Sequence, residues 1–260
     1  MATSATSPAA PVDSTLASRI PTLEYHYTEF KMGKTIQMKT EWFLAQIQWL
    51  NDNGFKTLTG EELLHFVQGV SRPPQKSCVL RFDLGQPAHQ NYHEVIIPAL
   101  EKHAFHAIFF LLTNMIKDTC EDDYLCWSQI QEWEQAGLIE VGSHGVYHPD
   151  YKKLSLAARR WDARESKKLI EVKIGHPISF FAYPFDSVPD RPHLLLKPYG
   201  YALAFAGYRP ERSVLFKDTT PYALPCYYVY SGETTYPVIT GSRGLTFGEM
   251  ILKAVAHSKK

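Results

Sequence analysis

Strand-like and helix-like segments alternate along this chain, and that alternation limits the folds it can adopt. From Ile20 onward, short apolar runs are separated by amphipathic stretches. Residues 107–112 form a continuous apolar run, which is typical of a strand buried on both faces of a parallel sheet. Phe43, Ile47 and Leu50 instead recur at helical spacing. The alternation therefore predicts an α/β fold built on a parallel sheet or barrel.

Individual elements can be assigned from the same patterns. The predicted strands are residues 20–25, 78–82, 107–112, 138–142 and 179–183. The predicted helices are residues 40–54, 59–67, 94–103, 127–136 and 155–172, with a last helix near the C-terminus. Capping residues are expected at their starts, namely Thr40, Thr59 with Glu62, Ser155, and Thr246 with Glu249.

Composition excludes several classes of protein. The 260 residues include 27 Lys and Arg against 27 Asp and Glu, so the formal net charge is zero. A neutral chain without a basic run is a poor candidate for a nucleic-acid binder. Hydrophobic residues make up 45% of the chain, which is too many for a disordered protein. No stretch approaches the ~20 apolar residues of a membrane span.

The domain organisation is expected to be simple. Residues 1–19 are mostly Ala, Ser, Thr and Pro and lack the apolar region of a signal peptide, so they are predicted to be a flexible leader. Residues 20–260 contain no internal repeat or linker and are predicted to form one domain. Cys120 and Cys126 flank a polar segment, where a local disulfide and a pair of reduced thiols are both conceivable.

Polar residues follow three of the predicted strands, in the segments RFDLG, GSHGVYHP and FAYPFD. In parallel α/β folds the chemistry lies at the C-terminal ends of the strands. The HxxxH pair His144 and His148 can chelate a divalent metal, and a nearby carboxylate would complete the site. Taken alone, the pair is a weak signal, because two histidines can simply form hydrogen bonds in a loop.

Beyond these motifs, the chain resembles the polysaccharide deacetylase family, also called the NodB-homology or carbohydrate esterase family 4 group. Within it, the chain is most similar to the subgroup that de-N-acetylates poly-β-1,6-N-acetylglucosamine. The resemblance runs from Ile20 to about Gly207. It is carried by the segments IPTLEYHYTEF, WFLAQIQWLNDNGFKTLTGEELLHFV, VLRFDLG in the place of TFDDG, HAIFFLLTN, WSQIQEWEQAGLIEVGSHGVYHPDYKKLS and ESKKLIEVKIGHPISFFAYPF. The resemblance implies a distorted (β/α) barrel that hydrolyses the N-acetyl group of a sugar.

The resemblance also implies roles for individual residues. Asp83 takes the place of the general base. His144 and His148 take the places of the two metal-binding histidines, with zinc or a similar divalent ion as the cofactor. Phe185 would donate its backbone N–H to the oxyanion, and His26 would act as general acid. The partner implied is an N-acetylated glycan, and the location implied is extracellular or in the cell envelope.

Four positions depart from the family pattern. Leu84 stands where the family has its metal-binding Asp, and Arg81 stands where it has Thr. Alternation along a strand places Arg81 on the same face as Asp83, where its charge either repels a metal ion or replaces it. In addition, Asp186 replaces a Gly and Gly145 replaces a Thr.

A replacement ligand could compensate for Leu84. It could come from the loop after Gly85, where His89 is the first candidate. Asp150 or Asp186 could also reach the site, although Asp150 is better placed to cap the next helix.

Leu84 is equally compatible with three different states of the site. Arg81 could supply the positive charge for metal-independent amide hydrolysis, as in the allantoinase-like amidohydrolases of this superfamily. The site could be inactive and the protein a glycan-binding pseudoenzyme. Finally, Leu84 could be an introduced change.

Four aromatic residues near these motifs are candidates for stacking against sugar rings, with core or rim packing as the alternative. They are Tyr25, Trp127, Tyr147 and Tyr183. The functions under comparison are thus a carbohydrate de-N-acetylase, a glycan-binding domain without catalysis and a small-molecule amidohydrolase.

Overall fold

A computed structural model describes residues 15–26, 28, 31–32, 35–36, 38–84, 91–120, 124–207, 214–215, 220–229 and 247–256. His89, Thr246 and residues 1–14 of the predicted leader lie outside these ranges. Residues 15–19 pack against the domain. The Ala17 side chain is buried, and the Arg72 guanidinium donates hydrogen bonds to the carbonyls of Leu16 and Ala17.

The centre of the fold is a sheet of parallel strands. Its strands are β1 (Ile20–Tyr25), β5 (Ser77–Leu84), β6 (Ala107–Leu111), β7 (Ile139–Ser143), β8 (Phe180–Ala182) and β9 (Leu203–Phe205), each paired in parallel with the next. Shorter strands flank it: β4 (Lys56–Thr57) beside β5, and β10 (Val214–Leu215) antiparallel to β1. A separate hairpin joins β2 (Lys31–Met32) and β3 (Thr35–Ile36).

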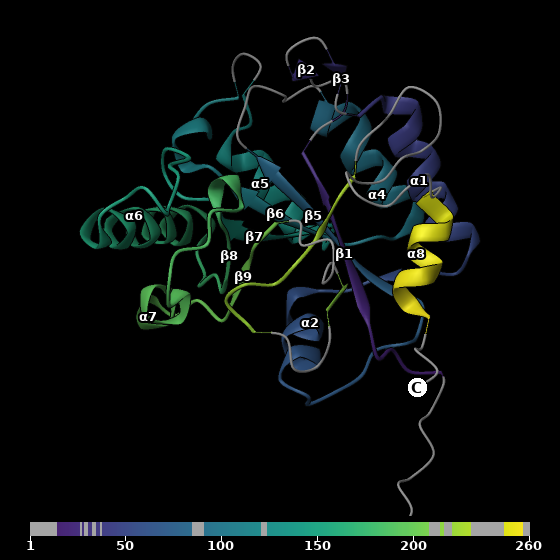
Figure 1. Cartoon of the computed structure of the whole chain (residues 1–260). Coiled ribbons are helices and arrows are strands. Elements are labelled where there is room, and N and C mark those ends of the chain that lie inside the picture. Colours follow the sequence, from purple (N-terminus) through teal and green to yellow (C-terminus); the bar gives the residue numbers. More distant parts are fainter. Residues whose placement is uncertain are drawn as a thin grey trace, which may run out of the picture.

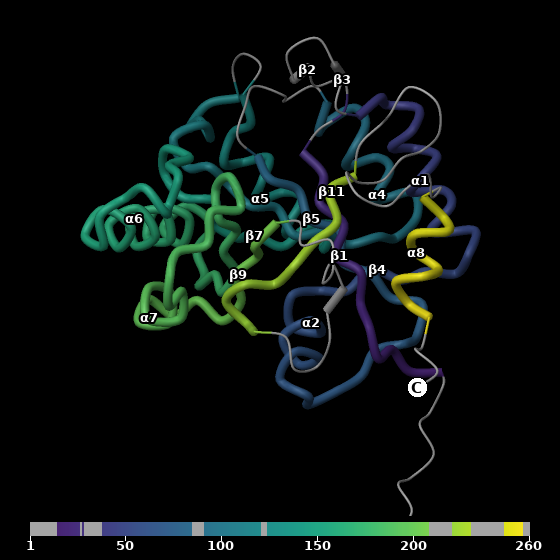
Figure 2. Tube along the Cα trace, in the orientation of Figure 1, coloured from purple at the N-terminus to yellow at the C-terminus, as the bar shows by residue number. Residues whose placement is uncertain are grey.

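Residues 220–229 connect the last strand of this sheet to the first. β11 (Tyr227–Tyr228) pairs in parallel with β1, and Leu224 forms a bridge to Phe205 of β9. The Ala206 N–H donates to the Leu224 carbonyl at 2.7 Å, and the Val229 N–H donates to the Glu24 carbonyl at 3.1 Å. Figure 2 shows β11 running beside β1. The curved sheet thereby closes on itself through one short segment, and the predicted single-domain distorted barrel is confirmed.

Helices surround the sheet. They are α1 (Thr40–Asp52), α2 (Gly60–Val67), α4 (Ile97–His103), α5 (Trp127–Gln135), α6 (Leu156–Ile174), α7 (Pro192–Leu196) and α8 (Phe247–Val255). A π-helical turn η1 (Tyr92–Ile96) precedes α4, and the 3₁₀ turns are η2 (Thr113–Met115), η3 (Pro184–Asp186) and η4 (Lys197–Tyr199). In Figure 1, α1, α4 and α8 lie on one side of the strands and α6 on the other, while α2 lies at one end.

The capping predictions can be compared with the observed helix starts. Thr59 and Glu62 form the predicted capping box at α2. The Ser155 hydroxyl accepts the Ala158 N–H at 3.2 Å, as expected for the start of α6. The assignment of Thr40 as a cap was wrong. Lys39 precedes α1, and Thr40 lies inside its first turn, where its hydroxyl instead bonds the Thr28 hydroxyl at 2.8 Å.

Side-chain alternation along the strands produces two apolar clusters, one on each face of the sheet. The outer cluster packs under the helices and includes Leu23, Leu80, Phe82, Leu84 and Phe109. The inner cluster fills the barrel and includes Ile20, Val79, Ile108, Phe110 and Leu203, with Leu63 and Phe66 of α2. Because α2 packs against the first residues of β1 and β5, that end of the barrel is filled. The polar side chains on the inner face lie toward the C-terminal ends of the strands.

The cysteines divide into two classes. Cys120 and Cys126 form a disulfide, which settles the alternatives left open by the sequence. Cys78 and Cys226 are free and buried. Among the described helices, none is both long and apolar enough to cross a membrane.

Candidate active site

Arg81 is the centre of a buried ion-pair cluster inside the barrel. It lies on β5, two residues before Asp83 and on the same face, as the strand period requires. Its Nη2 atom is 2.7 Å from Glu24 Oε2 and 2.7 Å from Asp83 Oδ2, and it lies 3.9 Å from Asp186 Oδ1. The guanidinium carbon is 5.5 Å from the ring centre of Phe205, within cation–π range. Arg81 is therefore fixed by carboxylates and an aromatic face, with no exposure to solvent.

Negative charge exceeds positive charge in this cluster, because three carboxylates surround one guanidinium. Burial raises the pKa of Glu24 well above its usual value, and repulsion from Asp186 and Asp83 adds to that effect against the attraction of Arg81. Burial also opposes ionisation of Asp83, but Arg81 and His144 outweigh it and lower the pKa of that carboxyl. Asp83 thus carries the negative charge, and Glu24 is the carboxyl that most readily keeps a proton.

His144 is held as a neutral imidazole with one nitrogen facing the site. It follows β7, and its Nδ1 lies 3.0 Å from the Ala182 carbonyl oxygen, so Nδ1 carries the proton. Its Nε2 therefore presents a lone pair 3.8 Å from Asp83 Oδ2. Burial lowers the pKa of His144 to about 4, which keeps the ring neutral at physiological pH. A second-sphere carbonyl that fixes the tautomer is a common feature of metal-binding histidines.

His148 completes the pair predicted from the HxxxH motif. Its ring centre lies 4.8 Å from that of His144 and 4.4 Å from that of Phe185. Phe185 and Asp186 have positive φ angles of 54° and 52°, which turn the chain sharply after β8. The structure thus brings together five sequence-predicted positions, namely Arg81, Asp83, His144, His148 and Phe185.

Gly145 allows the loop between the two histidines to be anchored. Its φ is +85°, and a Cβ at this position would lie 2.3 Å from Asp162 Oδ2. That close approach lets Asp162 accept the Val146 N–H at 3.0 Å and the Tyr151 hydroxyl at 2.8 Å. The replacement of the family's Thr by Gly145 therefore has a structural reason.

Replacing Gly145 by Ala is expected to lower the free energy of unfolding by about 2–4 kcal/mol, from left-handed strain and the clash with Asp162 together. Gly175→Ala is the matched control, because Gly175 has φ +87° and open space around it. Urea denaturation should show a smaller loss, about 1–2 kcal/mol, for the control. Equal losses in the two variants would show that the contact with Asp162 is unimportant.

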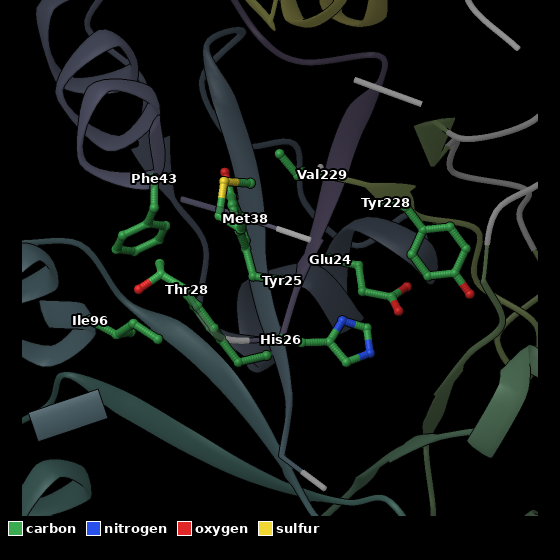
Figure 3. Close-up of a pocket in the computed structure, with 10 residues that line it drawn as sticks. Glu24, Tyr25, His26, Thr28, Met38, Phe43, Ile96, Tyr228 and Val229 are labelled. Atoms are coloured by element: carbon green, nitrogen blue, oxygen red, sulfur yellow. The ribbon is translucent and has the colours of Figure 1, made fainter. Parts of the chain in front are cut away.

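His26 lies just beyond β1, beside Glu24. Figure 3 shows the two side chains on the same side of the strand, with Tyr25 pointing away from them. Ligand atoms of Glu24, His26 and Asp83 all lie within 4.8 Å of one another. Burial lowers the pKa of His26, with the Asp83 charge opposing that effect. Together they line one wall of the cluster, close enough for a proton to pass between them.

The residues present fit a divalent cation. Asp83 Oδ1 is buried and has no hydrogen-bond partner among the described residues. Imidazole nitrogens and carboxylates gather around it, and their excess negative charge would be balanced by such an ion. Leu84 contributes nothing to this set, because it belongs to the outer apolar cluster.

The proposed replacement ligands have different outcomes. Asp150 is unsuited to the task, because it accepts hydrogen bonds from the Ser187 hydroxyl and the Lys152 N–H and pairs with Lys153 at 3.0 Å. Asp186 does approach the cluster, through Arg81. His89 is outside the described residues. Glu24 was missed by the sequence reasoning, although a lone carboxylate in the otherwise apolar strand IPTLEY was a usable signal.

The four aromatic candidates separate by exposure. Tyr25, Trp127 and Tyr183 are buried in the outer cluster, so their rings pack the core and present no free face. Tyr25, for example, stacks on Phe82 and donates its hydroxyl hydrogen to Gln46 at 3.0 Å. Tyr147, by contrast, is 66% exposed.

Comparison with known proteins agrees with this arrangement. YxkH of Bacillus subtilis, which is named for polysaccharide deacetylation, is 26% identical over 80% of this chain and 70% of its own. The poly-β-1,6-N-acetyl-D-glucosamine N-deacetylase of Escherichia coli K12 is 23% identical over 66% of this chain, but only 29% of that protein is matched.

Solved structures show the same fold. The Streptococcus pyogenes deacetylase PplD in complex with acetate superposes with a TM-score of 0.75 at 19% identity, over 93% of this chain and all of that one. IcaB from Ammonifex degensii gives a TM-score of 0.68 at 18% identity, over 93% of this chain and 99% of its own.

A sequence model of the family described as polysaccharide deacetylase matches residues 71–204, more than half of the chain. The matched segment contains Arg81, Asp83, His144, His148 and Phe185. This chain therefore belongs to the polysaccharide deacetylase family, whose members are hydrolases acting on amide bonds.

Proposed function

We propose that this protein removes acetyl groups from an N-acetylglucosamine-type glycan at the C-terminal end of its barrel. The observation that carries the proposal is the convergence of Asp83 with the lone pair of His144 Nε2, 3.8 Å apart, beside His148. An ionised carboxylate and two imidazoles in a buried pocket form the kind of group that hydrolyses amides.

The chain's own residues would divide the work as follows. His144 and His148 would hold a divalent metal, with zinc as the first candidate; when bound, the metal supplies a polarised acetamide oxygen and an activated water. Asp83 takes the proton of the attacking water. His26 carries a proton to the leaving amine, and its place beside Asp83 supports that transfer. The backbone N–H of Phe185 stabilises the oxyanion.

A second candidate is hydrolysis without a metal, in which Arg81 supplies the positive charge. The Nε and Nη1 atoms of Arg81 are buried and have no hydrogen-bond partner within the described residues. Two unused donors on a permanent cation could stabilise an oxyanion. The two candidates differ in their response to a chelator.

We further propose an extracellular or cell-envelope location. The Cys120–Cys126 disulfide supports an oxidising compartment. A polymeric glycan substrate, as in the name of the E. coli relative, is consistent with the same location.

Acetate release measured by proton NMR tests the function. The protein is expected to release acetate from a β-1,6-linked N-acetylglucosamine pentamer, and to release far less from a small amide such as allantoin. Preference for the small amide would assign the site to the amidohydrolase class instead. Binding of the pentamer without any release of acetate would identify a pseudoenzyme.

A further inference from the structure

Two large aromatic side chains are exposed side by side next to the site. Tyr147 is 66% exposed, and Trp161, in the first turns of α6, is 45% exposed. Their ring planes differ by only 8°, and their centres are 6.3 Å apart. At that spacing, parallel rings are strongly offset, so neither covers the face of the other completely. An exposed Trp and Tyr in one plane direction are the kind of apolar surface that marks a binding site.

This aromatic pair is fixed in position relative to the catalytic cluster. Tyr147 directly precedes His148, and Trp161 directly precedes Asp162. Asp162 is buried and accepts the Val146 N–H at 3.0 Å, which ties α6 to the loop that carries both rings' neighbours. Neither ring can therefore move far from His148 without breaking a buried hydrogen bond.

The charges near the pair indicate a neutral ligand. Arg164 and Glu165, the next charged residues along α6, pair with each other at 2.7 Å. The rings themselves offer flat apolar faces, and the apolar side of a pyranose ring matches such a face. A charged polymer would gain little here, because the local charges are already balanced.

We infer that Tyr147 and Trp161 form a subsite that stacks a pyranose ring of the glycan, next to the residue that is deacetylated. This inference rests on the proposed function for the identity of the glycan. It makes the substrate an oligomer or polymer, since a single sugar in the catalytic cluster would leave the aromatic pair unused.

Calorimetric titration of a β-1,6-linked N-acetylglucosamine pentamer and of the monomer tests the subsite. Trp161→Ala is expected to weaken pentamer binding about three- to tenfold, the effect of losing one aromatic contact. Trp161→Tyr keeps a flat ring and should stay within about twofold of the wild type. Leu169→Ala is the matched control, because Leu169 is also an exposed apolar residue of α6, at 38% exposure. It should bind the pentamer as the wild type does.

The outcomes separate the subsite from the proposed function. Equal pentamer dissociation constants for wild type and Trp161→Ala would overturn the subsite, even if acetate is released. A loss as large in Leu169→Ala would overturn it too. Weaker binding in Trp161→Ala together with no acetate release by the wild type would support the subsite and refute hydrolysis. Melting temperatures of all three variants establish that each is folded.

Discussion

Replacing Asp83 by Asn is expected to lower the rate of acetate release by about 10²- to 10⁴-fold, the usual contribution of a positioned general base. Asparagine has nearly the same shape but cannot accept the proton of the attacking water. Arg81 keeps its second partner Glu24 at 2.7 Å, so the buried guanidinium is not left alone and the barrel should stay folded. The rate is measured by NMR on the N-acetylglucosamine pentamer, with circular dichroism to confirm folding.

Asp150→Asn is the matched control for this change. Asp150 is a carboxylate in the loop after His148, but its partners are Ser187, Lys152 and Lys153, and it lies outside the cluster. Its removal should leave the rate of acetate release within about threefold of the wild type, because it contributes no step of the reaction. If Asp83→Asn also stays within that range, Asp83 is not the base.

Replacing Arg81 by Met is expected to lower the free energy of unfolding by about 3–5 kcal/mol, because a buried ion pair loses one member. Methionine fills much of the space between Phe110 and Phe205 but leaves Glu24 and Asp83 facing each other without a cation. Urea denaturation of the purified variant measures the loss.

The double variant Arg81→Met with Glu24→Gln separates charge from packing. Removing one carboxylate from the uncompensated pair should recover about 1–3 kcal/mol of the loss. Glu24→Gln alone should cost less than Arg81→Met, since Arg81 retains Asp83 at 2.7 Å. An Arg81→Met protein as stable as the wild type would show that the ion pairs do not stabilise the fold.

The sequence was most informative where local patterns determine structure. Apolar periodicity located β1, β5, β6, β7 and β8 to within two residues at each end, because strand period and apolar runs are properties of neighbouring residues. Closure of the barrel by residues 220–229 was not predictable in this way. β11 is a two-residue strand, and its pairing with β1 depends on chain segments some 200 residues apart.

The candidate site shows the same division. Strand alternation correctly placed Arg81 on the face of Asp83, since that relation involves a single strand. The role of Glu24 could not be read in the same way, because it depends on the register that pairs Glu24 with Arg81 across β1 and β5. Burial of Tyr25 and Tyr183 was equally hidden, since a ring near a motif can point to either face of its strand.

The most direct test of the central claim, that this site works with a divalent cation although Leu84 has replaced a ligand, is acetate release before and after removal of metal. The protein is dialysed against a chelator and assayed on the pentamer, and one equivalent of zinc is then returned. The account predicts that the chelator lowers the rate at least about 100-fold and that zinc restores it. An unchanged rate in the chelated protein would contradict the account and assign the positive charge of the reaction to Arg81.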